Sequence, residues 1–399
     1  MNEALSLLQP YPFEKLAAIS KDIEAPKTKQ PIDLSIGEPK HSTPEFIIEE
    51  VSAHLTDLAK YPSTRGTDAL REVLIDWLVR RYSLPRSSLS SDKNVLPVNG
   101  TREALFAIAQ CVINRRRGSP LVLIPNPFYQ IYEGATLLAG AEPWFVNCLP
   151  EFNFLPDFEV IPKTVWARCQ LVYLCSPGNP TGSVLNLALF TQLMELADRY
   201  EFIIAADECY SEIYLHEDQP PLGLLQAAAQ LGRTDYHRCV VFHSLSKRSS
   251  VPGLRSGFVA GDAGVIEQFL LYRTYHGCAM PLYVQAASCA AWRDELHVIE
   301  NRQRYRDKLN AVLEILTPLF SLRRPEAGFY LWPELPVDDI EFTRGLLAHE
   351  NITVLPGSFL ARIAGGQNPG RYRARIALVP PLDECIEAAR RIRDYMSLL

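Results

Sequence analysis

The stretch Cys239-Val240-Val241-Phe242-His243-Ser244-Leu245-Ser246-Lys247 is the starting point for interpreting this chain. Its first four residues form an apolar run that is typical of a buried strand, and a lysine follows soon after the run ends. A lysine at a strand end can present its amine to a carbonyl compound and capture it as a Schiff base. Ser244, Ser246 and Arg255 suit a phosphate, because hydroxyls donate hydrogen bonds and a guanidinium binds two oxygens. A carbonyl and a phosphate on one small molecule suggest pyridoxal phosphate. The segment alone also fits a surface lysine beside a serine-rich turn.

Further apolar runs flank this stretch and alternate with helical patterns. Strands are expected at Leu121–Ile124, Leu171–Cys175, Phe202–Ala206, Cys239–Phe242 and Gly257–Ala260. Helices are expected after Thr43 as N-cap, from Thr67 or Asp68, and over Glu103–Ile113, Leu187–Tyr200 and Asp294–Leu316. Because the strands are continuously apolar, the pattern predicts an α/β fold whose mostly parallel central sheet is covered by helices on both faces.

The character of the sequence changes near residue 290, where a long charged helix and then Gly328-Phe329-Tyr330-Leu331-Trp332 follow the sheet region. We therefore expect three parts. Residues 1–44 form an N-terminal arm and part of a small domain, residues 45–288 form a large cofactor-binding domain, and residues 289–399 form a small C-terminal α+β domain.

Composition narrows the classes of function. The net charge of −6 argues against a partner that is nucleic acid or an anionic membrane, since both need a basic face. Nine cysteines without a Cys-x-x-Cys pair fit reduced thiols, and eight histidines without His-Glu-x-x-His spacing make a metal site unexpected. With no signal-peptide core and no membrane-spanning apolar run, we expect a cytoplasmic protein.

Polar motifs follow three other apolar runs, Val95–Val98, Leu171–Cys175 and Phe202–Ala206, at the sheet edge where ligands bind in open α/β folds. Gly100 and Thr101 stand at a helix start, whose free N–H groups favour an anion. Asn179 lies within a Pro- and Gly-rich turn that can aim its amide into a cleft. Asp207 ends a buried strand and needs a partner such as a protonated pyridine nitrogen, while Tyr210 can reach an oxygen of the same ring. Each motif alone also fits an ordinary turn or helix cap.

The motifs taken in order carry a family resemblance. Asn-Gly-Thr-Arg-Glu-Ala (99–104), Asn-Pro-Thr-Gly (179–182), Asp-Glu-x-Tyr (207–210), Ser-Leu-Ser-Lys (244–247) and Arg-Ser-Gly (255–257) together resemble the class I/II aminotransferases of the fold type I pyridoxal-phosphate superfamily. The resemblance implies that Lys247 forms the Schiff base and carries the proton, that Asp207 pairs with the pyridine nitrogen, and that Tyr210 and Asn179 hold the ring 3-oxygen. It implies a phosphate site made of Gly100, Thr101, Ser244, Ser246 and Arg255.

The same resemblance implies residues for the substrate and for a partner subunit. Tyr129 stacks on the ring, with Phe128 as the less suitable neighbour. Arg375, rather than Arg373, binds the substrate α-carboxylate together with Asn179 and the Gly37 backbone. Tyr61 reaches the phosphate of the neighbouring subunit's cofactor, which implies a homodimer with shared sites. Arg273 is the candidate for a flexible cation that binds the distal carboxylate near the entrance.

Five stretches are similar to the N-succinyldiaminopimelate aminotransferases of proteobacteria: Leu8–Leu16, Ser35–His41, Asn126–Gly134, Cys209–Tyr214 and Tyr272–Gly277. This similarity implies an amino donor, N-succinyl-LL-2,6-diaminopimelate, and an acceptor, 2-oxoglutarate, in the biosynthesis of diaminopimelate and lysine. The alternatives are an aminotransferase for another acidic or aromatic amino acid and a cystathionine β-lyase-like enzyme of the same fold. A transcriptional sensor would need a basic helix-turn-helix domain, for which the roughly forty residues ahead of the body leave no room.

Overall fold

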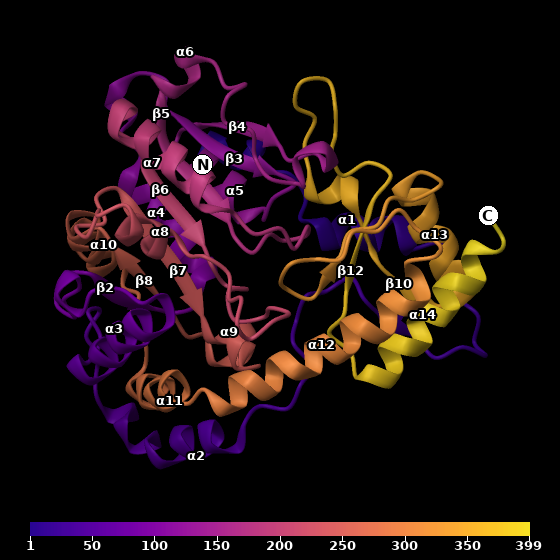
Figure 1. Cartoon of the computed structure of the whole chain (residues 1–399), viewed down its shortest axis with the longest axis horizontal. Coiled ribbons are helices and arrows are strands. Elements are labelled where there is room, and N and C mark those ends of the chain that lie inside the picture. Colours follow the sequence, from indigo (N-terminus) through magenta and orange to yellow (C-terminus); the bar gives the residue numbers. More distant parts are fainter.

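The protein is built on one seven-stranded sheet with a smaller sheet beside it (Figure 1). A computed structural model describes residues 1–399. In the large sheet the strand order is β2-β8-β7-β6-β5-β3-β4. The strands are β2 (Val95–Val98), β3 (Leu121–Asn126), β4 (Glu142–Asn147), β5 (Cys169–Cys175), β6 (Ile203–Asp207), β7 (Cys239–Ser244) and β8 (Gly257–Gly261).

The predicted mostly parallel sheet is confirmed, with one difference. Strands β4, β3, β5, β6 and β7 are parallel, whereas β8 runs antiparallel to both β7 and β2. The expectation for Gly257–Ala260 thus gave the right strand, but an apolar run carries no information about its direction. Strand β4 was not expected because it lies at the edge of the sheet, where its residues are largely half-buried or exposed.

Helices cover both faces of the large sheet. Alternate residues of each strand enter two separate cores: Val241 packs on one face, and Val240 and Phe242 pack on the other. The helices of this body are α2 (Glu45–Ala53), α3 (Asp68–Tyr82), α4 (Thr101–Val112), α5 (Ile131–Leu138), α6 (Lys163–Trp166), α7 (Leu187–Tyr200), α8 (Leu224–Gln230), α9 (Leu245–Arg248), α10 (Ala263–His276) and α11 (Leu282–Arg293).

Capping residues in the sequence predict some helix ends correctly and others not. Helix α7 has the predicted bounds, because the Asn186 side chain accepts a hydrogen bond from Leu189 N at its start and Glu201 adopts a left-handed conformation at its end. Thr67 caps α3 as expected. Thr43 is not the N-cap of α2: Pro44 is extended and takes that position, so the helix begins at Glu45.

The smaller part packs around a three-stranded antiparallel sheet of order β11-β12-β9. Its elements are β9 (Tyr330–Leu331), β11 (Leu355–Pro356), β12 (Ala374–Ala377), α13 (Asp339–Glu350) and α14 (Leu382–Met396). Strand β1 (Ile32–Asp33) pairs with β10 (Ile352–Thr353), so the segment before α2 joins residues from the C-terminal region. The proposed domain limits remain a prediction.

Two helices matter for the position of the cavity described below. Helix α12 (Leu296–Leu316) starts two residues later than expected and runs from beside α11 to beside α14 (Figure 1). Helix α1 (Pro12–Ser20) belongs to the N-terminal arm and packs near α13 and β11. No helix combines the length and the apolar character needed to cross a membrane.

Candidate active site

A cavity of about 360 Å³ lies where the large sheet meets the small one. On one side it is lined by residues at the carboxyl ends of β5, β6 and β7, namely Cys175, Asp207 and Ser244. On the other side it is lined by Tyr330 and Arg375 of the small sheet. The parallel strands therefore deliver their end residues to one place, as open α/β sheets do.

Lys247 projects into this cavity from the short helix α9. The Ser244 hydroxyl accepts a hydrogen bond from Ser246 N at 3.1 Å, which turns the chain into α9 directly after β7. The Lys247 Nζ atom donates to the Gly37 carbonyl at 2.5 Å. Burial lowers the pKa of the Lys247 amine to about 8. A substantial fraction of this amine is therefore neutral near physiological pH and able to act as a nucleophile or a base.

The anion-binding residues expected from the sequence lie together beside Lys247. Arg255 Nη1 lies 3.5 Å from the Ser246 hydroxyl, which itself lies 3.0 Å from the Ser244 hydroxyl. Gly100 caps helix α4 with φ of +81°, and a Cβ atom there would come within 2.2 Å of Arg255 Nη2. Glycine thus allows the Arg255 guanidinium to lie directly against the start of helix α4 at Thr101, and a guanidinium beside free helix N–H groups is suited to a phosphate.

Asp207 provides a buried carboxylate at the end of β6. Its Oδ2 atom accepts from the Tyr132 hydroxyl at 2.8 Å and its Oδ1 atom from Cys209 N at 3.2 Å. Burial raises the pKa of the Asp207 carboxyl, although these two hydrogen bonds oppose the shift. No lysine, arginine or histidine forms an ion pair with this carboxylate. A protonated ring nitrogen would supply the missing cation.

Tyr132 was not identified from the sequence. Its ring is buried and stacks on Tyr173 with 4.6 Å between centroids, and only the folded arrangement brings its hydroxyl to Asp207. The one available signal was its place three residues after Tyr129 in an aromatic stretch, and that spacing also fits a helix face in the core.

Tyr210 and Asn179 also face the cavity, each with a further partner. The Tyr210 hydroxyl lies 3.0 Å from the hydroxyl of Tyr330, a second residue that sequence reasoning did not select. Asn179 Oδ1 accepts from Arg375 Nη1 at 3.1 Å. A Cβ atom on Gly37 would clash with the Tyr330 hydroxyl at 1.8 Å, so the backbone of Gly37 approaches the site as closely as a glycine allows.

The two candidate arginines for the α-carboxylate occupy different surroundings. Arg375 lines the cavity, donates to the Ser35 carbonyl at 2.6 Å and keeps its buried Nε without a partner. Arg373 does not line the cavity, and its guanidinium pairs with Glu334 at 3.3 Å. Of the two, Arg375 is the residue placed to bind a carboxylate in this cavity.

The entrance holds a cation that the sequence interpretation missed. The exposed Arg102 donates from Nε to the Tyr129 hydroxyl at 2.9 Å and from Nη2 to the Tyr11 hydroxyl at 2.8 Å. All three residues line the cavity, whereas Phe128 is buried against Phe145 and does not. Arg102 forms no ion pair, so its charge is available to an anion.

The expectation for Arg273 is wrong. Its guanidinium is completely buried, contacts both carboxylate oxygens of Glu103 at 2.6 Å, and does not line the cavity. A buried guanidinium that is held by both oxygens of a carboxylate is not a flexible ligand for a distal carboxylate. Tyr61 also lies outside the cavity and is fully exposed, so its proposed reach into a neighbouring subunit stays a prediction.

Taken together, the residues present fit pyridoxal phosphate. They offer an amine of lowered pKa, a cradle for an anion and a buried carboxylate without a cationic partner, all facing one cavity. The same residues provide Arg375 for a substrate carboxylate on the side of the small sheet.

Comparisons with known proteins identify the family of the chain. Residues 29–392 match the family model described as aminotransferase class I and II. The LL-diaminopimelate aminotransferase of Desulforudis audaxviator is 30% identical over 98% of this chain and 96% of its own length. A crystal structure of an aminotransferase from Neisseria meningitidis is 50% identical with a TM-score of 0.95 and full coverage of both chains. A probable N-succinyldiaminopimelate aminotransferase from Thermus thermophilus is 25% identical with a TM-score of 0.85, covering 96% of this chain and 100% of that one.

Proposed function

Because this chain belongs to the class I and II aminotransferase family, whose members use pyridoxal phosphate, we propose that it moves an amino group between N-succinyl-LL-2,6-diaminopimelate and 2-oxoglutarate. The reaction belongs to the biosynthesis of diaminopimelate and lysine. We assign the covalent attachment of the cofactor to Lys247.

The cofactor supplies an electron sink for the carbon that loses its proton. The chain's own residues position the reactants and move that proton. Arg375 and Asn179 orient the substrate α-carboxylate, and the neutral Lys247 amine accepts the proton from the adjacent carbon. Asp207 holds the ring nitrogen in its charged form, and Ser244, Ser246 and Arg255 hold the phosphate.

The observation that carries the substrate assignment is the pair Arg375 and Arg102 in one cavity, neither in an ion pair with a carboxylate of the chain. With Arg375 assigned to the α-carboxylate, Arg102 is free to bind a second carboxylate farther along the substrate. Both the donor and 2-oxoglutarate carry such a second carboxylate. Arg102 therefore takes the role that the sequence interpretation gave to Arg273.

Free LL-diaminopimelate is the second candidate donor, as the name of the Desulforudis relative indicates. The two donors differ at the distal end, because the free form carries an ammonium there and the succinylated form carries an amide and an additional carboxylate. Glu38, the exposed acid that lines the cavity, could pair with the ammonium but would repel the succinyl group. Glu38→Gln should therefore weaken turnover of the free donor and raise that of the succinylated donor.

We further propose that the protein acts as a homodimer in the cytoplasm. Tyr61 is completely exposed and follows the exposed Leu55 and Leu58, which supports an interface that covers this segment in a second subunit. All nine cysteines are free, as suits a reducing compartment.

A panel of amino donors with 2-oxoglutarate as acceptor tests the proposed function. It should include N-succinyl-LL-diaminopimelate, LL-diaminopimelate, aspartate, an aromatic amino acid and cystathionine. The succinylated donor should give the highest kcat/KM, and cystathionine should release no pyruvate when the keto acid is omitted. Higher turnover of aspartate or of the aromatic amino acid would refute the substrate assignment, whereas the assignment to the family would stand.

A further inference from the structure

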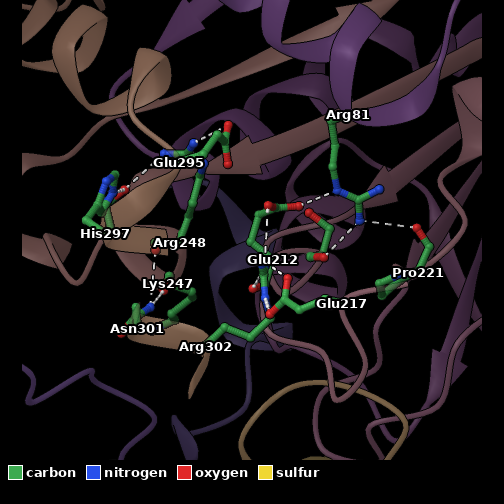
Figure 2. Close-up of polar contacts among 12 residues, drawn as sticks. Arg81, Glu212, Glu217, Pro221, Lys247, Arg248, Glu295, His297, Asn301 and Arg302 are labelled. Carbon is green, nitrogen blue, oxygen red and sulfur yellow. Dashed lines mark hydrogen bonds and ion pairs between the residues drawn. The ribbon is translucent and has the colours of Figure 1, made fainter. Parts of the chain in front are cut away.

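The backbone of Lys247 is held by a residue from a different part of the fold. Asn301 lies on α12, and its Nδ2 atom donates to the carbonyls of Lys247 at 3.1 Å and of Arg248 at 3.2 Å (Figure 2). These carbonyls end the four-residue helix α9, which is too short to pair them internally. Asn301 thus supplies the hydrogen-bond donors for the free carbonyls at the C-terminal end of the helix that carries the reactive amine.

The orientation of the Asn301 amide is fixed from its other side. Its Oδ1 atom lies 2.7 Å from His41 Nδ1 and 3.1 Å from the Ser250 hydroxyl, which donates to it. All the donors and acceptors of the amide are therefore used, and a flipped amide would set its NH₂ group against the donors and its oxygen against the two carbonyls.

His41 in turn is oriented by a buried lysine. Lys308 Nζ lies 2.7 Å from His41 Nε2 and donates to the Val379 carbonyl at 3.1 Å, and it has no carboxylate partner. Because the Asn301 oxygen can only accept, His41 carries its proton on Nδ1 and donates it to Asn301, and its Nε2 atom then accepts from the Lys308 amine. Burial lowers the pKa of His41 to about 4, which agrees with a neutral ring.

These contacts connect Lys247 to the 37–41 segment by two separate routes. Its amine donates to the carbonyl of Gly37, and His41 lies four residues farther along the same segment. Helix α12 is anchored at the residue next to Asn301, since Arg302 pairs with Glu217 at 2.9 Å (Figure 2). The side-chain amine of Lys247 is thus bonded directly to the 37–41 segment. The backbone carbonyl of Lys247 is connected to the same segment through Asn301 and His41.

We propose that Asn301, oriented by His41 and Lys308, is a positioning residue that sets where the Lys247 amine lies in the cavity. The proposal rests on the proposed function of Lys247. None of the three residues lines the cavity, so they act on the reaction only through the lysine. Removing the restraint should impair proton transfer more than substrate binding, because proton transfer depends on the position of the amine to within fractions of an ångström.

The test uses the holoenzyme and two measurements. Asn301→Leu keeps similar side-chain volume but removes the hydrogen bonds to both carbonyls. It should lower kcat by roughly ten- to a hundredfold with little change in KM. It should also shift the pH midpoint of the absorbance of the lysine-bound cofactor, which a purely structural role would leave in place. Lys308→Met should act in the same direction, and more weakly.

Matched controls separate positioning from packing. Tyr305 lies on the same face of α12, with its ring centroid 4.6 Å from that of His41, and its hydroxyl has no hydrogen-bond partner. Tyr305→Phe removes only this hydroxyl and should leave kcat and the titration unchanged. His41→Asn keeps a donor in the place of Nδ1 and should retain more activity than His41→Leu, whose thermal unfolding shows whether the fold is intact.

Two results would overturn the proposal. One is a folded Asn301→Leu or His41→Leu enzyme whose cofactor absorbance titrates as in the wild type. The other is a Tyr305→Phe enzyme that is impaired to the same degree. Failure of the proposed function itself has a different signature: borohydride reduction of the wild-type holoenzyme would leave the peptide containing Lys247 without cofactor.

Discussion

Replacing Arg102 by glutamine should change which substrates the enzyme handles and leave its chemistry intact. Glutamine keeps hydrogen-bonding capacity toward the hydroxyls of Tyr11 and Tyr129 but removes the positive charge. A hydrogen bond to a charged group contributes about 1.5–3 kcal/mol. Arg102 is exposed, so solvent screening reduces this value to about 1–2 kcal/mol. The expected loss in kcat/KM for a dicarboxylic substrate is therefore roughly five- to thirtyfold.

The assay compares 2-oxoglutarate with pyruvate as amino acceptor, since pyruvate lacks the distal carboxylate. Arg102→Gln should lower kcat/KM for 2-oxoglutarate alone, and the difference between variant and wild type should shrink as salt is raised. Arg116→Gln, which removes an exposed arginine remote from the cavity, is the matched control and should have no effect. Equal losses for both acceptors would refute a role for Arg102 in binding the distal carboxylate.

The remaining predictions concern the cofactor and the interface. Lys247→Ala should stay folded but lose turnover, and a borohydride-reducible bond to the cofactor in that variant would contradict the assignment. Asp207→Asn should lower kcat by roughly 10²–10³-fold with a much smaller loss of cofactor affinity, measured by equilibrium dialysis. In the folded protein the pKa of the Lys247 amine is lowered to about 8. The rate at which the cofactor-free protein captures pyridoxal phosphate should therefore increase as pH rises toward 8 and level off above it. A capture rate that is independent of pH between 6 and 9 would argue against a neutral amine at Lys247. Mixing Lys247→Ala chains with Tyr61→Phe chains should restore activity through hybrids with one native site, and an active monomer in ultracentrifugation would exclude this.

The parts of the site that could be predicted are those that local sequence determines. Asp207, Ser244 and Lys247 each follow an apolar strand, and parallel strands bring their ends together, so their meeting follows from the pattern. Gly100 could be assigned because a glycine before a helix start allows close approach of other groups to the free N–H groups there, and the structure brings Arg255 to that place. The same reasoning identified the central sheet, because its strands are continuous apolar runs.

The remainder depends on packing that no short stretch encodes. Arg102 reaches the cavity because Tyr11 and Tyr129 hold its guanidinium there, and Tyr11 comes from a distant segment. Arg273 looked free because its partner, Glu103, lies on another helix. The small sheet was described only coarsely, because strands such as Tyr330–Leu331 contain two residues and show no periodicity.

The position of Tyr11 bears on how the protein should be handled. The N-terminal arm places this side chain against the cavity, and Leu8 packs over Gly134 of α5, where an added Cβ atom would lie 3.8 Å from Leu8 Cδ2. An affinity tag fused at Met1 would extend this same arm and could change apparent specificity by shifting Tyr11, without touching the other residues of the pocket. Leu399 is exposed at the end of the segment that follows α14, on the far side of the small sheet, and offers the safer point of attachment (Figure 1).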